Sequence, residues 1–348
     1  MKLYDHIRDG KTYIIAEMSG NHGGKLENAL AIVRAAAAAG ADCLKLQTYT
    51  ADTITLDCRT DDFLVHDGLW KKRYLYDLYK EAYTPWEWHA AIKQEAESLG
   101  MDFLSTPFDF TAVDFLETLG VELYKIASFE AVDIPLIRKA ASTGKPVILS
   151  CGMASAEEIQ EALDACRSVG NDHVVLLKCC SAYPTDFDTM NLRTIPDMRS
   201  RFGVPVGLSD HSEGSLASIA AVTLGAVVVE KHLCLASCQS VDSDFSLNET
   251  QFAQLVRDIR STERALGKVN YAPSPAEAQS LAHRRSLYVA ADIRKGEPFT
   301  AENLRSVRPA FGLHTRYYDE LLEHGRAAKD LAFGTPLHWE DVDGVEPH

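Results

Sequence analysis

The chain has 348 residues, of which 46% are hydrophobic and 24% are charged, and its formal net charge is −15. This is ordinary globular composition, and the length allows one large domain and a small one. The acidic balance argues against a nucleic-acid partner, and the lack of an apolar run of about 18 residues argues against a membrane span.

Short β-rich runs alternate with amphipathic helices along most of the chain. The expected strands are Thr12–Ser19, Asp42–Tyr49, Asp102–Pro107, Leu123–Ser128, Pro146–Cys151, His173–Cys180, Val204–Ser209 and Ala226–Leu235. The expected helices are Leu26–Ala39, Pro85–Leu99, Thr111–Leu119, Pro135–Thr143, Ala156–Val169, Asn191–Arg201, Ser215–Leu224 and Glu249–Leu266. Several strands are apolar at nearly every position, which is typical of a parallel sheet covered by helices.

Eight strand–helix units predict an α/β fold of the closed (β/α)8 barrel type, also called a TIM barrel. An open, doubly wound sheet is the alternative. No GxGxxG motif follows the first strand, which disfavours a dinucleotide-binding sheet.

The pattern changes after the last expected helix. Residues 268–283 contain Pro273 and Pro275 among polar residues, and we interpret them as a linker. The barrel is therefore expected to span residues 1–267. Residues 284–348 have short β runs and turn signals, and they predict a small second domain.

The eight cysteines do not form a CxxC pair, so their spacing fits neither a zinc ribbon nor a disulfide scaffold. Reduced thiols in a cytosolic enzyme are the expected state. The first residues lack the apolar segment and cleavage site of a secretory signal, which also favours the cytoplasm.

Polar residues gather where the expected strands end, which is where barrels of this type carry their active-site groups. Those named for the site are Glu17, Lys45, Gln47, Thr106, Lys125, Ser128, Glu130, Ser150, Ser181, Tyr183, Ser209, His211 and His232. A purely structural barrel does not need polar side chains at one end of all eight strands. The set as a whole therefore indicates an active site.

Strand alternation places His211 and His232 on inward faces of neighbouring strands, where two imidazoles could hold a divalent ion for Lewis-acid chemistry. Lys45 and Lys125 are unusual inside a barrel, because a buried ammonium needs an anion beside it. Glu17, Glu130 or an anionic ligand could supply that anion. A Schiff-base lysine is a further option, which a metal site would make redundant.

Eight ordered motifs carry a resemblance to a known family. They are IAEMSGNHGGKLENAL, GADCLKLQTY, STPFD, YKIASFE, ILSCGMAS, LLKCCSAYP, GLSDHSEGS and EKHLCL. Together they resemble the sialic acid synthase family, over nearly the whole chain. The tail RRSLYVAADIRKGEPFTAENLRSVRP resembles that family's C-terminal antifreeze-like (SAF, β-clip) domain. The stretches TITL, LYDLYKEAYTPWEWH, PFD, CSAYP and RPAFGLH look most similar to the pseudaminic acid branch.

The resemblance implies a transferase that condenses phosphoenolpyruvate with an open-chain amino sugar, releasing phosphate by C–O cleavage. The implied phosphoenolpyruvate contacts are Lys45 and Thr106 for the carboxylate, and Lys125, Ser128, Ser150 and Ser209 for the phosphate, with Ser181 in place of the family's asparagine. His211 and His232 would hold Mn²⁺ or Mg²⁺. Glu17 resembles the family's strand-one glutamate and is a candidate base for the attacking water.

The implied sugar contacts are Gln47, Glu130, Tyr183, Asp242 and Arg308. Arg308 would enter the partner subunit's site, which implies a domain-swapped homodimer. In the pseudaminic branch the sugar is a 2,4-diacetamido-2,4,6-trideoxy-altrose, whose methyl group Phe108, Phe129 or Phe187 could favour. The alternatives are a legionaminic or N-acetylneuraminic acid synthase, another 3-deoxy-sugar-acid synthase, a class II aldolase, and a non-catalytic carbohydrate- or ice-binding protein.

Overall fold

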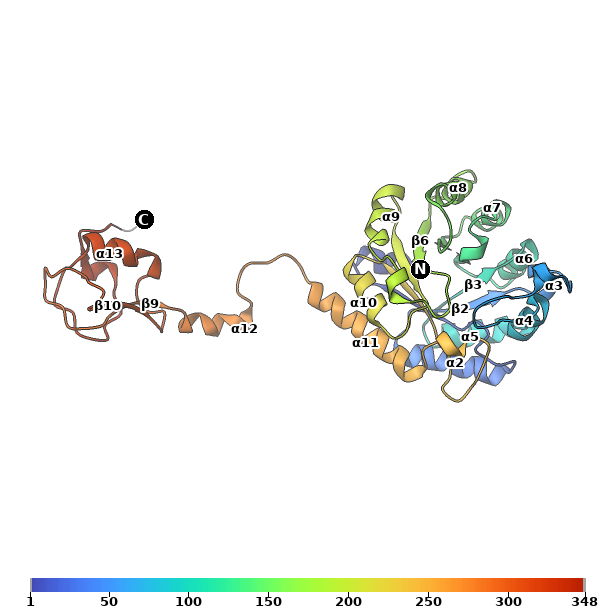
Figure 1. Cartoon of the computed structure of the whole chain (residues 1–348), viewed down its shortest axis with the longest axis horizontal. Coiled ribbons are helices and arrows are strands. Elements are labelled where there is room, and N and C mark those ends of the chain that lie inside the picture. Colours follow the sequence, from blue (N-terminus) through green and yellow to red (C-terminus); the bar gives the residue numbers. More distant parts are fainter. Residues whose placement is uncertain (1, 347–348) are drawn as a thin grey trace. The chain divides into compact units, whose positions relative to one another are not determined.

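The computed structural model describes residues 2–346, and the chain divides into two compact units between Gly267 and Lys268. In the first unit, eight parallel strands close into a barrel in chain order, with helices outside them (Figure 1). The strands are β1 Tyr13–Glu17, β2 Cys43–Thr48, β3 Asp102–Pro107, β4 Tyr124–Ile126, β5 Val147–Ser150, β6 Val174–Cys179, β7 Val206–Asp210 and β8 Val228–His232. The predicted (β/α)8 barrel is confirmed.

The helices of this unit follow the local signals in the sequence. They are α1 Lys2–Arg8, α2 Leu26–Ala39, α3 Ala51–Ile54, α4 Leu75–Ala82, α5 His89–Ser98, α6 Phe110–Thr118, α7 Ile134–Ala141, α8 Ala156–Arg167, α9 Thr194–Phe202, α10 Leu216–Thr223 and α11 Glu249–Leu266. The alanine-rich helix α2 ends at Gly40, whose φ of 87° is the left-handed conformation that glycine adopts easily. Capping boxes begin α8 at Ser155 and α11 at Asn248.

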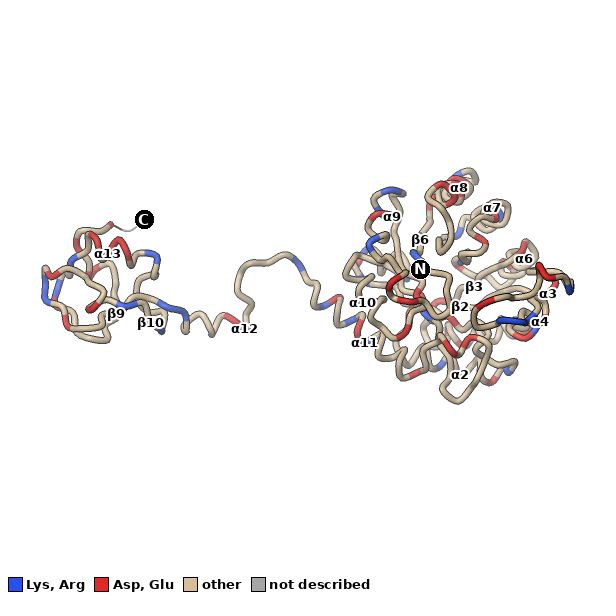
Figure 2. Tube along the Cα trace, viewed as in Figure 1, with Lys and Arg blue, Asp and Glu red and all other residues tan. Residues whose placement is uncertain are grey.

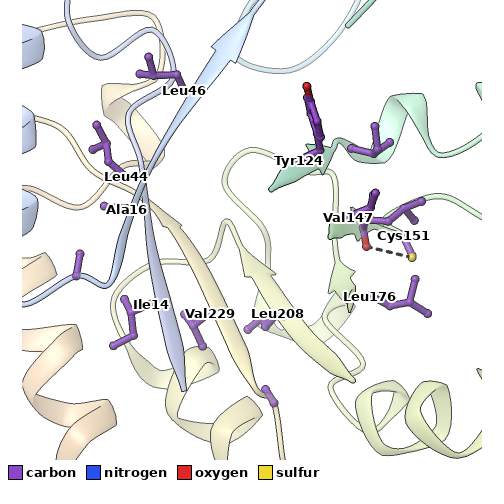
Figure 3. Close-up of a cluster of buried hydrophobic side chains, with 14 of the residues drawn as sticks. Ile14, Ala16, Leu44, Leu46, Tyr124, Val147, Cys151, Leu176, Leu208 and Val229 are labelled. Atoms are coloured by element: carbon purple, nitrogen blue, oxygen red, sulfur yellow. Dashed lines mark hydrogen bonds between the residues drawn. The ribbon is translucent and has the colours of Figure 1, made fainter. Parts of the chain in front are cut away.

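Alternation along the strands divides the barrel into two apolar layers. Side chains such as Ile14, Leu44 and Val229 belong to the core shared with the helices (Figure 3). Their neighbours along the same strands, such as Ile15 and Cys43, belong to a second cluster inside the barrel. The polar strand ends therefore stand above an apolar floor.

The segment between β2 and β3 is longer than an ordinary barrel connection. It contains α3, a β-bridge between Leu64 and Tyr74, and α4 before it reaches α5. The sequence pattern left residues 50–84 unassigned, because their helical pieces are short and their apolar residues lack a clear period. This excursion matters below because it forms one wall of the main cavity.

The second unit has its own small core and short elements. They are α12 Pro275–Ala278, β9 Ser286–Val289, β10 Leu304–Val307, α13 Tyr318–His324, β11 Arg326–Ala327 and β12 Val342–Asp343. Strands β9 and β10 pair antiparallel, as do β11 and β12. Leu287, Phe299 and Leu337 are fully buried or nearly so in its core.

Acidic residues are distributed over helices and loops of both units and are not confined to one segment (Figure 2). Among the helices of residues 2–346, none is both long and apolar enough to cross a membrane.

Candidate active site

The C-terminal mouth of the barrel contains buried polar atoms that other protein groups leave unsatisfied. Within the described residues, no protein hydrogen bond reaches Thr106 Oγ1, Ser150 Oγ, Glu230 Oε2 or His232 Nδ1. Buried polar groups normally have partners, because leaving one unpaired costs about 1–3 kcal/mol. Such a gathering on three strands, β3, β5 and β8, is what a binding site for a polar ligand requires.

An ionic cluster lies at the centre of this mouth. The Lys45 ammonium is 3.0 Å from Glu17 Oε2 and 3.1 Å from Glu230 Oε1, and all three side chains are buried. Two carboxylates around one cation would carry net negative charge. Lys125 compensates for it from the neighbouring side, with its ammonium 3.6 Å from Glu230 Oε1. We expected Glu17 or Glu130 as the anion beside these lysines. The prediction of Glu17 is confirmed for Lys45, but its second partner is Glu230 and not Glu130.

The protonation states follow from this arrangement. Burial alone would raise the pKa of Glu230, but the ammonium groups of Lys125 and Lys45 lower it to about 2. Burial opposes the charge on Lys45, yet Glu17 and Glu230 raise its pKa above the usual value. For Lys125 burial prevails and lowers the pKa, because Glu230 compensates it only in part. The Lys125 ammonium is thus the cation of the cluster that would gain most from an added anion.

Hydroxyl groups stand near the two lysines. Ser209 Oγ donates a hydrogen bond to Glu230 Oε1 at 3.1 Å, and Thr106 and Ser150 present their unpaired hydroxyls from β3 and β5. Hydroxyls and ammonium groups together are the donors that carboxylate and phosphate oxygens accept from. This part of the mouth is therefore suited to a small polyanion.

A tight turn after β5 brings two more serines together. The Gly152 N–H donates to Ser128 Oγ at 3.1 Å. A Cβ at position 152 would stand 2.3 Å from Ser181 Oγ and 2.9 Å from Ser128 Oγ, so a larger residue would displace both hydroxyls. The structure thus places Ser128 and Ser181 at the same edge of the mouth, which is where we expected them.

The two histidines lie beside one another, as strand alternation predicted. Their ring centroids are 5.3 Å apart, and both side chains are buried. His211 Nδ1 is bonded to the Cys180 carbonyl at 3.1 Å, while burial keeps the pKa of His232 well below its usual value. Burial also opposes a charge on His211, but the Cys179 thiol and the Cys180 carbonyl raise its pKa. The neutral His232 imidazole is the form that binds divalent ions, and an ion bound at His211 would displace its proton. Among residues 2–346, no group of three or more His, Cys, Asp or Glu side chains is arranged so that it could hold a metal ion, so any ion here would take its other ligands from water or substrate.

A cavity of about 400 Å³ adjoins the histidines. Gln47, Glu130, Tyr183, His232 and Asp242 all line it, so four of the five expected sugar contacts surround one space. The rest of its lining is mostly apolar and includes residues from the excursion between β2 and β3. Those lining residues are Ile54, Val65, Trp70, Leu75, Leu78, Tyr79 and Ala82. The volume and mixed lining are typical of a site for a small organic molecule.

Hydrogen bonds connect the ionic cluster to this cavity. Gln47 Nε2 donates to Glu17 Oε1 at 2.8 Å and to Ser19 Oγ at 2.9 Å. Ser19 Oγ in turn donates to Asp242 Oδ2 at 2.6 Å. These hydrogen bonds fix the orientation of Gln47 between the two halves of the site. A ligand that spans both halves would therefore contact polar groups that are already oriented.

Several expected residues stand elsewhere or were missed. Arg308 lies in the second unit, where its side chain is exposed. Phe187 is exposed and does not line the cavity, whereas Phe108 and Phe129 do. Ser19 and Trp70 were missed. Trp70 lies in the segment between β2 and β3, to which the sequence pattern assigned no element. Ser19 is the last residue of the first expected strand.

Glu130 provides a pH test of the cavity. Burial raises its pKa to about 7, above the ordinary value of 4.5. The folded state then holds a proton that the unfolded state has lost, so stability falls as pH rises from about 4.5 to 7 and stays constant above that. We expect Glu130→Gln to raise the free energy of unfolding by about 2–3 kcal/mol at pH 8 and not at pH 4.5.

Urea unfolding at both pH values measures this difference. The exposed Glu122 offers a matched control, because Glu122→Gln should change neither value. Equal stabilisation at both pH values would contradict a raised pKa for Glu130.

Comparisons with known proteins identify the family of the chain. Residues 32–271 match the model of the NeuB family, and residues 284–343 match the SAF domain. A pseudaminic acid synthase of Campylobacter jejuni is 45% identical over 342 residues, covering 98% of this chain and 99% of the relative. An N,N'-diacetyllegionaminic acid synthase of Legionella pneumophila is 34% identical, covering 95% and 94%. The crystal structure of an N-acetylneuraminic acid synthetase from Leptospira borgpetersenii superposes with a TM-score of 0.69 at 31% identity, covering 78% and 90%.

Proposed function

Since this chain belongs to the NeuB family, we propose that it is the enzyme that condenses phosphoenolpyruvate with 2,4-diacetamido-2,4,6-trideoxy-altrose, giving pseudaminic acid and phosphate. The observation that carries this proposal is the Lys45–Glu17–Glu230–Lys125 cluster directly beside a mostly apolar cavity. The higher identity to a pseudaminic acid synthase than to a legionaminic acid synthase, 45% against 34%, supports this choice of sugar.

Phosphoenolpyruvate would occupy the ionic half of the site. Its phosphate would accept from Lys125 and from the hydroxyls of Ser128, Ser150, Ser181 and Ser209, and its carboxylate from Lys45 and Thr106. An added anion would satisfy hydroxyls that are buried without partners, and it would stabilise the Lys125 ammonium. These donors are held in place before the ligand binds, so they can stabilise the negative charge that develops in the transition state.

The amino sugar would occupy the cavity, with its aldehyde toward the histidines. Gln47, Glu130, Tyr183 and Asp242 would bind its hydroxyl and amide groups. The apolar wall made by Ile54, Val65, Leu75 and Leu78 would accept the C6 methyl and acetyl methyl groups. A methyl against an apolar wall is worth only about 1–3 kcal/mol, so this wall biases the choice of sugar and does not fix it alone.

The reaction forms one C–C bond and breaks one C–O bond. C3 of phosphoenolpyruvate attacks the aldehyde carbon, and water adds to the oxocarbenium carbon at C2. Glu17 takes a proton from that water. Burial and Glu230 raise the pKa of Glu17, which makes its carboxylate a stronger base, while the Lys45 ammonium favours the ionised form that can accept the proton. The tetrahedral intermediate then releases phosphate by breaking the C2–O bond, while the O–H electrons of the new hydroxyl form the keto group and its proton leaves with the phosphate. The proton that Glu17 took from water passes to the oxygen of the former aldehyde, which becomes a hydroxyl group.

His211 and His232 would hold Mn²⁺ or Mg²⁺. The pair fits such an ion, since the two rings adjoin and His232 Nδ1 is buried without a protein partner among the described residues. When bound, the ion would polarise the aldehyde oxygen as a Lewis acid. All eight cysteines are free in the structure, which supports a reducing compartment such as the cytoplasm as the place of reaction.

Phosphate release tests the function. Chelator-treated protein would be mixed with phosphoenolpyruvate, Mn²⁺ and one candidate sugar at a time. Release with the diacetamido-trideoxy-altrose is the expected result, and loss of release without the metal would support the role of the histidines. Release with N-acetylmannosamine or the legionaminic precursor in its place would overturn the choice of sugar. Absence of release with every sugar would overturn the proposed reaction.

We also propose a homodimer in which Arg308 of one subunit completes the sugar site of the other. Arg308 is exposed, and it follows directly after β10 in the SAF unit. We expect Arg308→Ala to raise the KM for the sugar by at least about tenfold, because a charge-assisted hydrogen bond contributes about 1.5–3 kcal/mol. Complementation provides the control: mixing Arg308→Ala chains with Glu17→Gln chains should restore part of the activity. A mixture that shows no more activity at low sugar concentration than the two variants measured separately would contradict a shared site.

A further inference from the structure

One ion pair in the barrel wall lies outside the site described above. Asp210 of β7 and Lys231 of β8 are register partners, and Asp210 Oδ2 is 3.0 Å from the Lys231 ammonium. Neither side chain is exposed to any measurable extent. Both belong to the outward-facing positions of their strands, where the same two strands also carry the apolar residues Leu208 and Val229.

Such a pair is costly, because two buried charges lose their hydration and often recover no more than they lost. The charged groups of both residues nevertheless have further hydrogen-bond partners. Ser218 Oγ on α10 donates to Asp210 Oδ2 at 2.6 Å, and Lys231 donates to the Ser212 carbonyl. Well-packed apolar residues would serve stability at least as well, so a role other than stability is indicated.

The pair encloses the backbone on both sides of His211. The Ser212 N–H donates to Asp210 Oδ1 at 2.9 Å, which is the hydrogen bond of an Asx turn with residue 211 at its centre. Ser212 Oγ donates to the same oxygen at 2.6 Å. Because Lys231 binds the Asp210 carboxylate and the Ser212 carbonyl, one ammonium holds the residues before and after His211.

The same lysine immediately precedes His232. Among residues 2–346, the Nδ1 atom of His232 has no hydrogen-bond partner and is free to bind an ion, while the ring packs against Phe245 with centroids 4.9 Å apart. The position of the ring therefore depends on this packing and on the backbone. That backbone is held by the β1 ladder, by the Leu247 N–H that donates to the His232 carbonyl at 3.0 Å, and by the neighbouring ion pair.

We propose that Asp210 and Lys231 are positioning residues, which hold His211 and His232 at the separation that a divalent cation requires. This inference rests on the proposed function, since it assumes that the two histidines bind a metal ion. Outer groups that orient metal ligands commonly contribute about 10- to 100-fold to metal affinity. The contribution here would come through the main chain, because neither residue is bonded to an imidazole in the structure.

The test compares the full-length double variant Asp210→Asn/Lys231→Met with the single variant Arg260→Met. The double variant removes both charges while leaving an amide oxygen for the Asx turn. Arg260 forms an ion pair with Asp42 at the opposite end of the barrel, 2.7 Å away, and is a matched control. Mn²⁺ alone is titrated into each chelator-treated protein and followed by the electron paramagnetic resonance of the free ion.

We expect the double variant to bind Mn²⁺ about 10- to 100-fold more weakly than the unchanged chain, with a thermal midpoint no lower than that of Arg260→Met. Unchanged Mn²⁺ affinity in a folded double variant would overturn the proposal. If the double variant does not fold, Ser218→Ala removes one hydrogen bond to Asp210 and should show a smaller loss of affinity.

A metal-free measurement separates this proposal from the proposed function. Histidine side chains labelled with ¹⁵N report whether the His211 ring keeps one environment, bonded to the Cys180 carbonyl. We expect a single sharp set of signals in the unchanged chain and broadened or multiple signals in the double variant. If the unchanged chain bound no Mn²⁺, the proposed metal role would be wrong. The histidine signals alone would then decide whether the pair positions these rings.

Discussion

Replacing Lys45 by methionine is expected to lower the free energy of unfolding by about 3–5 kcal/mol and to reduce kcat/KM by at least about 100- to 1,000-fold. The loss of stability follows from the two buried carboxylates that share this ammonium, Glu17 at 3.0 Å and Glu230 at 3.1 Å. Without Lys45, Glu17 keeps only the Gln47 amide as a close partner. Urea unfolding and phosphate release measure the two effects on the same preparation.

Lys125→Met is the matched comparison. Lys125 is equally buried, but its nearest carboxylate is 3.6 Å away and burial already lowers its pKa. We expect a similar loss of kcat/KM, with a smaller loss of unfolding free energy than in Lys45→Met, because Lys125 is paired with one carboxylate and Lys45 with two. The two lysines thus separate a structural charge from a ligand-binding charge. Equal loss of stability in both variants would contradict this division, and full activity in either would remove that lysine from the phosphoenolpyruvate site.

The barrel itself could be predicted because its signals are local and repeated. The alanine-rich run before Gly40 predicted both ends of α2 correctly. Apolar runs such as VVLL correctly predicted strands that are covered on both faces. Alternation also predicted that Lys45 and Gln47 share a face, and both do contact Glu17. The alternation of side chains depends only on the strand itself, so it can be predicted without knowing which strands are its neighbours.

Partners across the barrel could not be predicted in the same way. Lys45 lies opposite Glu230 because β1 stands between β2 and β8 in a closed ring, and the stagger of those strands sets which side chains meet. Nothing in the sequence near Lys45 records that stagger. Glu130 was an equally reasonable candidate from its position after β4, yet it lines the cavity instead.

The elements of the excursion between β2 and β3 could not be predicted for a different reason. Its pieces, α3 and α4, have 4 and 8 residues, too short for a helical period to stand out. Its shape depends on distant contacts, such as the Trp70 indole N–H that donates to the Val241 carbonyl at 3.1 Å. The part of the cavity wall that we propose to contact the variable groups of the sugar is therefore the part that the sequence pattern predicts least well.

Glu17→Gln is expected to lower kcat by about 100- to 10,000-fold while leaving phosphoenolpyruvate affinity within about threefold. Glutamine keeps an oxygen that can accept from Gln47, so the hydrogen-bond chain to Ser19 and Asp242 can persist. It has nearly the size and shape of glutamate, but it cannot take a proton from water, and it removes one of the two carboxylates beside Lys45. Single-turnover phosphate release and calorimetric binding of phosphoenolpyruvate measure the two quantities separately.

Asp242→Asn provides the control, because Asp242 terminates the same hydrogen-bond chain from the cavity side and accepts from Ser19 and Gly20. A defect in the chain would affect both variants alike, whereas loss of a base affects only the first. We therefore expect Asp242→Asn to raise the KM for the sugar and to keep kcat within about tenfold, since a hydrogen bond to a bound sugar contributes mainly to binding. Full turnover by Glu17→Gln would show that another group, or the departing phosphate itself, receives the proton from water.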